Sequence, residues 1–243
     1  MAENQHMLPL TAHLRELRKR LIRSAVAALA GFLVCYYYSK ELYDLLARPL
    51  IPAMPEGSAF LAFTGVAEPF FVYMKVGIAG GIILGSPVIL YEIWAFVAPG
   101  LHKSEKRLFI AIIASSLLLF AAGVVFAYLA VFPFAFKYLM SYASPELKPF
   151  ISMGGYFSLA TKLLIAFGAV FQLPLAMLVA SRLGLAGARQ FLSWWRYAIV
   201  AIFVAAAILT PTPDAFNQLL MAGPLVVLYG IGVLAAWLFG RKK

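Results

Sequence analysis

Long apolar runs recur along the chain at the length of membrane-spanning helices. A helix that crosses a bilayer needs about 20 mostly apolar residues, and each run here contains few charged side chains. We predict six spanning helices, which cover residues 20–39, 69–95, 108–132, 154–180, 193–209 and 215–239. The pattern therefore predicts an all-α, polytopic integral membrane protein with a single domain over residues 1–243.

The composition supports this reading. Hydrophobic residues make up 63% of the chain and charged residues 12%, whereas soluble domains are about half apolar and about one-quarter charged. The single cysteine, Cys35, excludes an internal disulfide and a thiolate zinc site. Because the first apolar run continues to Tyr38, we interpret it as an uncleaved helix rather than a signal peptide.

The charges divide unequally between the two ends of the predicted bundle. The end with the N-terminus, the second and fourth loops and the C-terminus carries 14 of the 20 Lys and Arg residues and four of the ten acids, so the whole net charge of +10 lies there. By the positive-inside rule this end is cytoplasmic, and both termini with it. The four tryptophans, at helix ends on this same side, fit an interfacial aromatic belt. They are Trp94, Trp194, Trp195 and Trp237.

Small residues and prolines indicate how the helices pack. Gly77, Gly81 and Gly85 repeat every fourth residue, which gives the second helix a smooth face for close helix contact. Three prolines inside spans each remove a backbone donor and predict bends, hence a curved bundle, although kinks without function are an equally good explanation of any one. They are Pro87, Pro174 and Pro224.

The fifth span is short. Its apolar part, residues 197–209, rises only about 20 Å, whereas a bilayer core is about 30 Å thick. We hypothesise that the membrane is locally thinned on the non-cytoplasmic side.

No enzymatic motif is present. The histidines His6, His13 and His102 lack His-Glu-x-x-His spacing, there is no phosphate-binding glycine loop, and Gly85-Ser86-Pro87 lacks the second glycine of a nucleophile elbow. We therefore predict no enzymatic role, no cofactor and no metal.

Two acids inside basic clusters are the candidate binding residues. Residues 10–21 place four leucines at helical spacing and charges on the other faces, which predicts an interfacial helix leading into the membrane. Glu16 lies within this basic segment, and Glu105 is flanked by basic residues in the second cytoplasmic loop. Negative spots on a +10 surface favour a cationic ligand, but pairing with neighbouring basic side chains is an equally good explanation of each acid.

Three segments carry a family resemblance. They are residues 13–21 (HLRELRKRL), residues 86–101 (SPVILYEIWAFVAPGL) running into Glu105, and residues 209–218 (LTPTPDAFNQ). Through them the chain resembles the TatC family, the core subunits of the twin-arginine translocase, which exports folded proteins across the bacterial cytoplasmic (inner) membrane. The resemblance extends along nearly the whole chain.

The resemblance implies a receptor and scaffold that binds twin-arginine signal peptides at its cytoplasmic face. Glu16 and Glu105 match the receptor acids of the family, and a carboxylate accepts the planar guanidinium fork in a way that lysine cannot reproduce. The resemblance also assigns functional positions to Arg18, Arg20 and Phe96, and matches Pro49 to a structural proline of the first periplasmic loop.

The resemblance also implies partners within the membrane. Thr210 and Gln218 match a polar patch that docks single-span TatA/TatB-type subunits. Gln172 stands where many relatives have a glutamate, and either a partner helix or an interhelical bond within its own bundle is expected for it. We expect homo- and hetero-oligomers in contact with lipid, and no nucleic-acid partner.

Two other functions remain open from the sequence. The basic face, the bent helices and the intramembrane Lys75 and Lys162 suggest a secondary transporter of a small anion, although no internal repeat or midplane acid supports it. Snorkelling to the headgroups is the simpler explanation of these lysines. An assembly factor without a receptor site is the third class.

Overall fold

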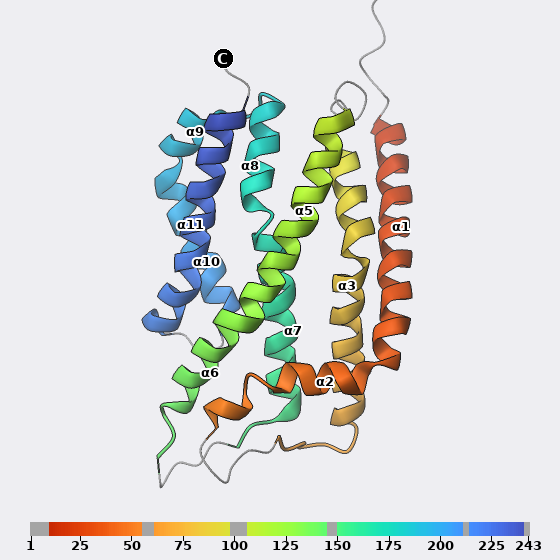
Figure 1. The fold of residues 1–243 in the computed structure, drawn as a ribbon, viewed down its shortest axis with the longest axis vertical. Coiled ribbons are helices and arrows are strands. Elements are labelled where there is room, and N and C mark those ends of the chain that lie inside the picture. Colours follow the sequence, from red (N-terminus) through yellow and green to blue (C-terminus); the bar gives the residue numbers. More distant parts are fainter. Residues whose placement is uncertain (1–9, 55–60, 98–105, 145–149, 211–213, 241–243) are drawn as a thin grey trace, which may run out of the picture.

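The computed structural model describes residues 10–54, 61–97, 106–144, 150–210 and 214–240. Long helices standing side by side make up almost all of this part of the chain (Figure 1). Five of its helices are long and apolar enough to cross a membrane, and a sixth apolar helix is shorter. The predicted all-α fold of six membrane helices is confirmed. The elements are α1 (Leu10–Tyr37), α2 (Ser39–Ala47), η1 (Ile51–Ala53), α3 (Glu68–Val97), α5 (Lys106–Phe126), η2 (Ala127–Val131), α6 (Phe132–Met140), α7 (Met153–Val170), α8 (Leu173–Arg182), α9 (Ala188–Ser193), α10 (Trp195–Leu209) and α11 (Ala215–Phe239).

The chain turns place the predicted basic segments at one end of the bundle. The start of α1, the end of α3, the start of α5, the end of α8, α9 and the end of α11 all lie at the top of Figure 1, while α2, α6, the end of α10 and the start of α11 lie lower. The alternation of loops predicted from the sequence is therefore present in the fold.

The backbones of α1 and α3 meet at glycines. A Cβ atom on Gly81 would lie 2.5 Å from the Phe32 nitrogen and 2.9 Å from the Ala28 oxygen, and one on Gly31 would lie 2.5 Å from the Gly81 oxygen. Gly85 likewise faces the backbone of α1 at Ala27. The predicted smooth glycine face of the second span is confirmed, and it packs against the first span.

The first span begins earlier than predicted. Residues 10–21, predicted as an interfacial helix leading into the membrane, form the first turns of one continuous helix, α1, from Leu10 to Tyr37, which stands upright beside α3 (Figure 1). The segment has no proline or glycine to end the helix, and packing against α3 continues to its first turns. The first turns of α1 therefore belong to the bundle.

Two prolines interrupt the later spans differently. Before Pro133 the backbone widens into the π-helical turn η2 and then continues as α6, so the third span ends at Met140 rather than at residue 132. The wider turn accommodates the missing donor without ending the helix.

Before Pro174 the fourth span is interrupted between Val170 and Leu173, as the predicted bend requires. Pro87 and Pro224 lie inside continuous helices.

The segments around the fifth span also differ in detail. The fifth span divides into α9 and the 15-residue α10, which rises only about 22 Å, so the membrane-thinning hypothesis stays a prediction. The loop after the first span contains the short helix α2, which the sequence analysis did not predict.

Substituting Gly81 with alanine is expected to separate α1 from α3. The new methyl group would overlap backbone atoms, which cannot move aside as a flexible side chain can. We expect the variant to lose about 1–3 kcal/mol of unfolding free energy, measured as a lower thermal midpoint in detergent. Gly223→Ala is the matched control, since nothing lies within 4 Å of its added Cβ. Equal midpoints for the two variants would contradict this assignment.

Candidate functional site

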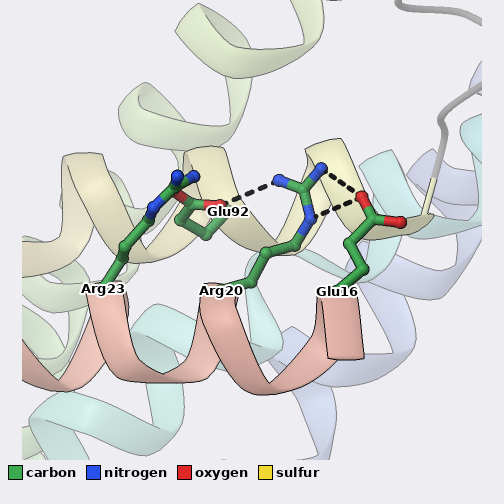
Figure 2. A network of polar contacts seen from close by, with 4 residues as sticks. All are labelled: Glu16, Arg20, Arg23 and Glu92. Carbon is green, nitrogen blue, oxygen red and sulfur yellow. Dashed lines mark hydrogen bonds and ion pairs between the residues drawn. The ribbon is translucent and has the colours of Figure 1, made fainter. Parts of the chain in front are cut away.

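Four charged side chains meet where α1 lies against the end of α3 (Figure 2). Arg20 donates from Nε and Nη2 to Glu16 Oε1, at 3.0 and 2.6 Å. The same guanidinium donates from Nη1 to Glu92 Oε2 at 2.8 Å, and Arg23 Nη1 donates to Glu92 Oε1 at 3.3 Å. One arginine of α1 thus joins an acid of its own helix to an acid of α3.

Burial increases from Glu16 towards Glu92. The side chain of Glu16 is 42% exposed and that of Arg20 is 19% exposed, whereas that of Glu92 is only 5% exposed. A carboxylate taken out of water is stable only when cations and hydrogen bonds replace its hydration. Two guanidiniums supply this replacement, so Glu92 is a fixed anchor and Glu16 is the accessible end of the network.

The sequence-predicted site residues are only partly brought together. Glu16 and Arg20 are in direct contact, and Arg18 is exposed on the same helix. Phe96 of α3 stacks on His13 of α1, with ring centroids 4.5 Å apart and planes 20° apart. Glu105 lies outside the described residues.

Glu16 pairs with a neighbouring basic side chain, as one of the two explanations from the sequence expects, but only through one of its two oxygens. Both hydrogen bonds from Arg20 end on Oε1, and no side chain in the described part of the chain donates to Oε2, which points away from Arg20 in Figure 2. A carboxylate has about four acceptor sites. Glu16 therefore keeps acceptor capacity while it is paired.

A small groove of about 120 Å³ adjoins the charges. Its walls are mainly apolar, with Arg20 and Glu92 as the charged members. The lining residues are Leu17, Arg20, Leu21, Ser24, Glu92, Ile93, Phe96 and Val97. The groove therefore offers an apolar surface beside two charged side chains.

Sequence reasoning missed the importance of Glu92 and His13. The sequence left Glu92, at the cytoplasmic end of the second predicted span, open between a ligand-facing and a simply hydrated side chain, yet an acid within a spanning segment is by default a candidate functional residue. Two arginines one turn apart, Arg20 and Arg23, were the signal that a partner acid is needed. The stacking of His13 on Phe96 joins residues far apart in sequence, and no local pattern indicates it.

Gln172 belongs to a polar cluster between α3, α5 and the interruption of the fourth span. Trp94 Nε1 donates to Ser116 Oγ at 2.8 Å, Ser116 Oγ donates to Gln172 Oε1 at 2.6 Å, and Gln172 Nε2 donates to the Ser116 carbonyl at 3.0 Å. The interhelical bond expected as one alternative for Gln172 is present, while a contact with a partner helix stays a prediction. The interfacial assignment of Trp94 is wrong, because its side chain is buried and its indole N–H is bound inside the bundle.

The other predicted positions lie away from this end. Gln218 Nε2 donates to the Phe203 carbonyl at 3.0 Å, and Thr210 Oγ1 donates to the Ala207 carbonyl at 3.2 Å. Gln218 borders an apolar groove of about 480 Å³ along α10. Pro49 lies between α2 and η1.

The two intramembrane lysines have separate partners. Lys75 Nζ donates to Ser158 Oγ at 2.8 Å, and Lys162 Nζ donates to the Ile208 carbonyl at 2.5 Å. Both side chains are exposed at the molecular surface. Each lysine therefore has a hydrogen-bond partner on a neighbouring helix.

Comparison with known proteins decides the family. The family model described as Sec-independent protein translocase protein (TatC) matches residues 12–224. The chain belongs to the TatC family. Among relatives, it is 42% identical over 243 residues to the TatC protein of Desulforapulum autotrophicum, covering 100% of this chain and 89% of that protein. It is 40% identical over 225 residues to TatC of Escherichia coli, covering 93% and 86%.

Solved TatC structures agree with this assignment. A crystal structure described as the twin-arginine translocase receptor TatC superposes with a TM-score of 0.83 at 38% identity, covering 92% of this chain and 97% of that one. As a TatC protein, the chain is a multi-pass inner-membrane component of the Sec-independent translocase and not an enzyme. Family membership replaces the transporter and assembly-factor readings.

Replacing Ser116 with alanine is expected to leave the buried indole N–H of Trp94 without its acceptor and Gln172 Oε1 without its donor, while Gln172 Nε2 keeps the backbone carbonyl of residue 116. The cost is about 1–3 kcal/mol of unfolding free energy, measured by thermal unfolding with tryptophan fluorescence as a second signal. Ser115→Ala, at the exposed neighbouring position, is the control. A wild-type midpoint for Ser116→Ala would show that the TatC bundle does not depend on this cluster.

Proposed function

We propose that this TatC protein is the receptor and scaffold of its translocase, with the end that carries Glu16 facing the cytoplasm and binding twin-arginine signal peptides. The observation that carries the proposal is Glu16, whose side chain is 42% exposed and whose Oε2 accepts no hydrogen bond from the described side chains, beside an apolar groove and within a cluster of basic residues. The similar crystal structure is described as a twin-arginine translocase receptor, which supports the same role.

The chemistry of the ligand fits the site. A signal peptide with paired arginines presents planar guanidiniums that carboxylates accept in a directional way. We assign Glu16 and Glu105 to these arginines, and the Phe96–His13 stack and the apolar groove to the adjoining apolar residues of the peptide. Arg18 and Arg20 belong to the same site and keep it positive.

The surrounding charge gives the site its selectivity. In the topology predicted from the sequence, the same end carries the whole net charge of +10, so it repels cations that make no directional bond. A hydrogen bond to a charged group contributes about 1.5–3 kcal/mol, or roughly one to two powers of ten in affinity. Two acids that each bind one guanidinium therefore allow the receptor to bind signal peptides with paired arginines more tightly than other export signals with basic ends.

We propose the groove along α10 as the docking surface for single-span partner subunits. Val200, Val204 and Ile208 are exposed along it, and Gln218 of α11 supplies one polar group at its edge. An apolar helix gains packing against such a surface, and an amide within lipid adds a specific bond. Thr210 lies at the end of the same helix, and Gln172 is assigned a supporting role through the bundle.

The receptor role is tested by site-specific crosslinking to a precursor that carries Arg-Arg or Lys-Lys. We expect the wild type to label the Arg-Arg precursor more strongly by roughly tenfold or more, and the Glu16→Ala, Glu105→Ala double variant to lose this preference. Glu41→Ala, which removes an exposed acid of α2 at the other end of the bundle, serves as the control. Equal labelling of both precursors by the wild type and the double variant would refute the receptor role.

The docking surface is tested by disulfide crosslinking in a Cys35→Ala background. Val204→Cys, in the α10 groove, is expected to crosslink to a partner subunit carrying one cysteine in its span. Leu118→Cys on α5 is the matched control, because its side chain is also exposed, at 71% compared with 55% for Val204. Equal crosslinking at both positions would show that α10 has no special role in docking.

A further inference from the structure

All three guanidinium nitrogens of Arg20 donate hydrogen bonds, to two different acids. Its Nη1 binds the buried Glu92, while its Nε and Nη2 both bind one oxygen of Glu16. Figure 2 shows the result as a chain of contacts from α3 through Arg20 to the first turns of α1. The outermost atom of this chain is Glu16 Oε2.

We propose that Glu92 and Arg20 are positioning residues that fix the carboxylate plane of Glu16, and that this fixed plane makes the receptor select arginine over lysine. The inference rests on the proposed function, since it concerns how the same site recognises its ligand. Neither Glu92 nor Arg20 needs to contact the signal peptide for this role.

Burial of Glu92 is what makes the arrangement rigid. An isolated ion pair four residues apart on an exposed helix is weak and does not hold a side chain in one rotamer. Here Arg20 is also held by a carboxylate that is only 5% exposed, where an ion pair is screened less than at the surface. Arg20 therefore remains in place and holds Glu16.

The backbone beneath the network is rigid as well. Glu92 belongs to α3, whose contact with α1 is fixed at Gly81 and Gly31 without space for a single methyl group. The helix that carries Glu16 and the helix that carries Glu92 therefore keep their register. Preorganised acceptors of this kind bind without the cost of ordering a side chain.

A fixed carboxylate distinguishes the two basic side chains. A lysine ammonium is a point charge with rotatable donors and binds a carboxylate in many orientations, whereas a guanidinium is planar and needs an aligned acceptor. Because Arg20 already occupies Oε1, the site offers one directed oxygen and little free negative charge. Fixing the carboxylate of Glu16 therefore strengthens the binding of arginine more than the binding of lysine.

The test measures binding of Arg-Arg and Lys-Lys signal peptides to the purified full-length protein and takes the ratio of the two affinities. Arg20→Lys keeps the charge and the pairing with Glu92, but one ammonium cannot at the same time place two aligned donors on Glu16. We therefore expect the ratio to fall about tenfold, the effect of one charge-assisted hydrogen bond. Glu92→Gln is expected to lower the ratio similarly. The double variant should fall no further than the larger single effect, because both changes break one chain of contacts.

The matched control is Arg48→Lys, the same chemical change at an exposed arginine beyond the end of α2, at the opposite end of the bundle; it should leave the ratio unchanged. Arg20→Lys retains the buried ion pair, so it tests the inference even if Glu92→Gln does not fold. A wild-type ratio in Arg20→Lys, or equal losses for both peptides in either variant, overturns the positioning role while the receptor stands. A wild type without any preference for Arg-Arg overturns both.

Discussion

The close contact between α1 and α3 is the constraint on which the charged end of the molecule depends. Glycines bring the two backbones so near that one added methyl group would overlap main-chain atoms. Only at this separation does an arginine of α1 reach a carboxylate of α3 and still bind an acid on its own helix. In lipid, where no hydrophobic force drives apolar helices together, packing at small residues supplies this approach.

Two polar networks inside the bundle supply their own hydrogen-bond partners. No water is available in the bilayer core, so each group must find a partner within the protein. Glu92 obtains two guanidiniums, and the Trp94 indole, the Ser116 hydroxyl and the Gln172 amide satisfy one another. These two networks lie along α3, one near its end and one facing α5 and the fourth span. They specify which faces of the helices meet, a choice that apolar packing alone leaves open.

The sequence predicted those features that depend on local composition. Apolar length located the six spans, with the sixth matching α11 at both ends, and the glycine repeat and Pro174 were correctly read as a contact face and a bend. Errors arose where tertiary contacts decide. The helix runs on through Pro133 because a wider turn absorbs the missing donor, and α1 extends back to Leu10 because its first turns pack on α3. The pairing of Arg20 with Glu92 spans 72 residues, and no local pattern encodes it.

The charge arrangement at this end resolves an apparent conflict in the proposed role. A receptor acid bound to its own neighbour would be unavailable if both of its oxygens were paired, yet both hydrogen bonds from Arg20 end on one oxygen of a side chain that is 42% exposed. An unpaired carboxylate would attract every cation near the positive surface, because Coulomb attraction does not depend on the shape of the cation. Pairing with Arg20 reduces this general attraction and keeps a directional acceptor. Under the proposed function, selectivity for arginine therefore depends on the pairing, and not on a free charge.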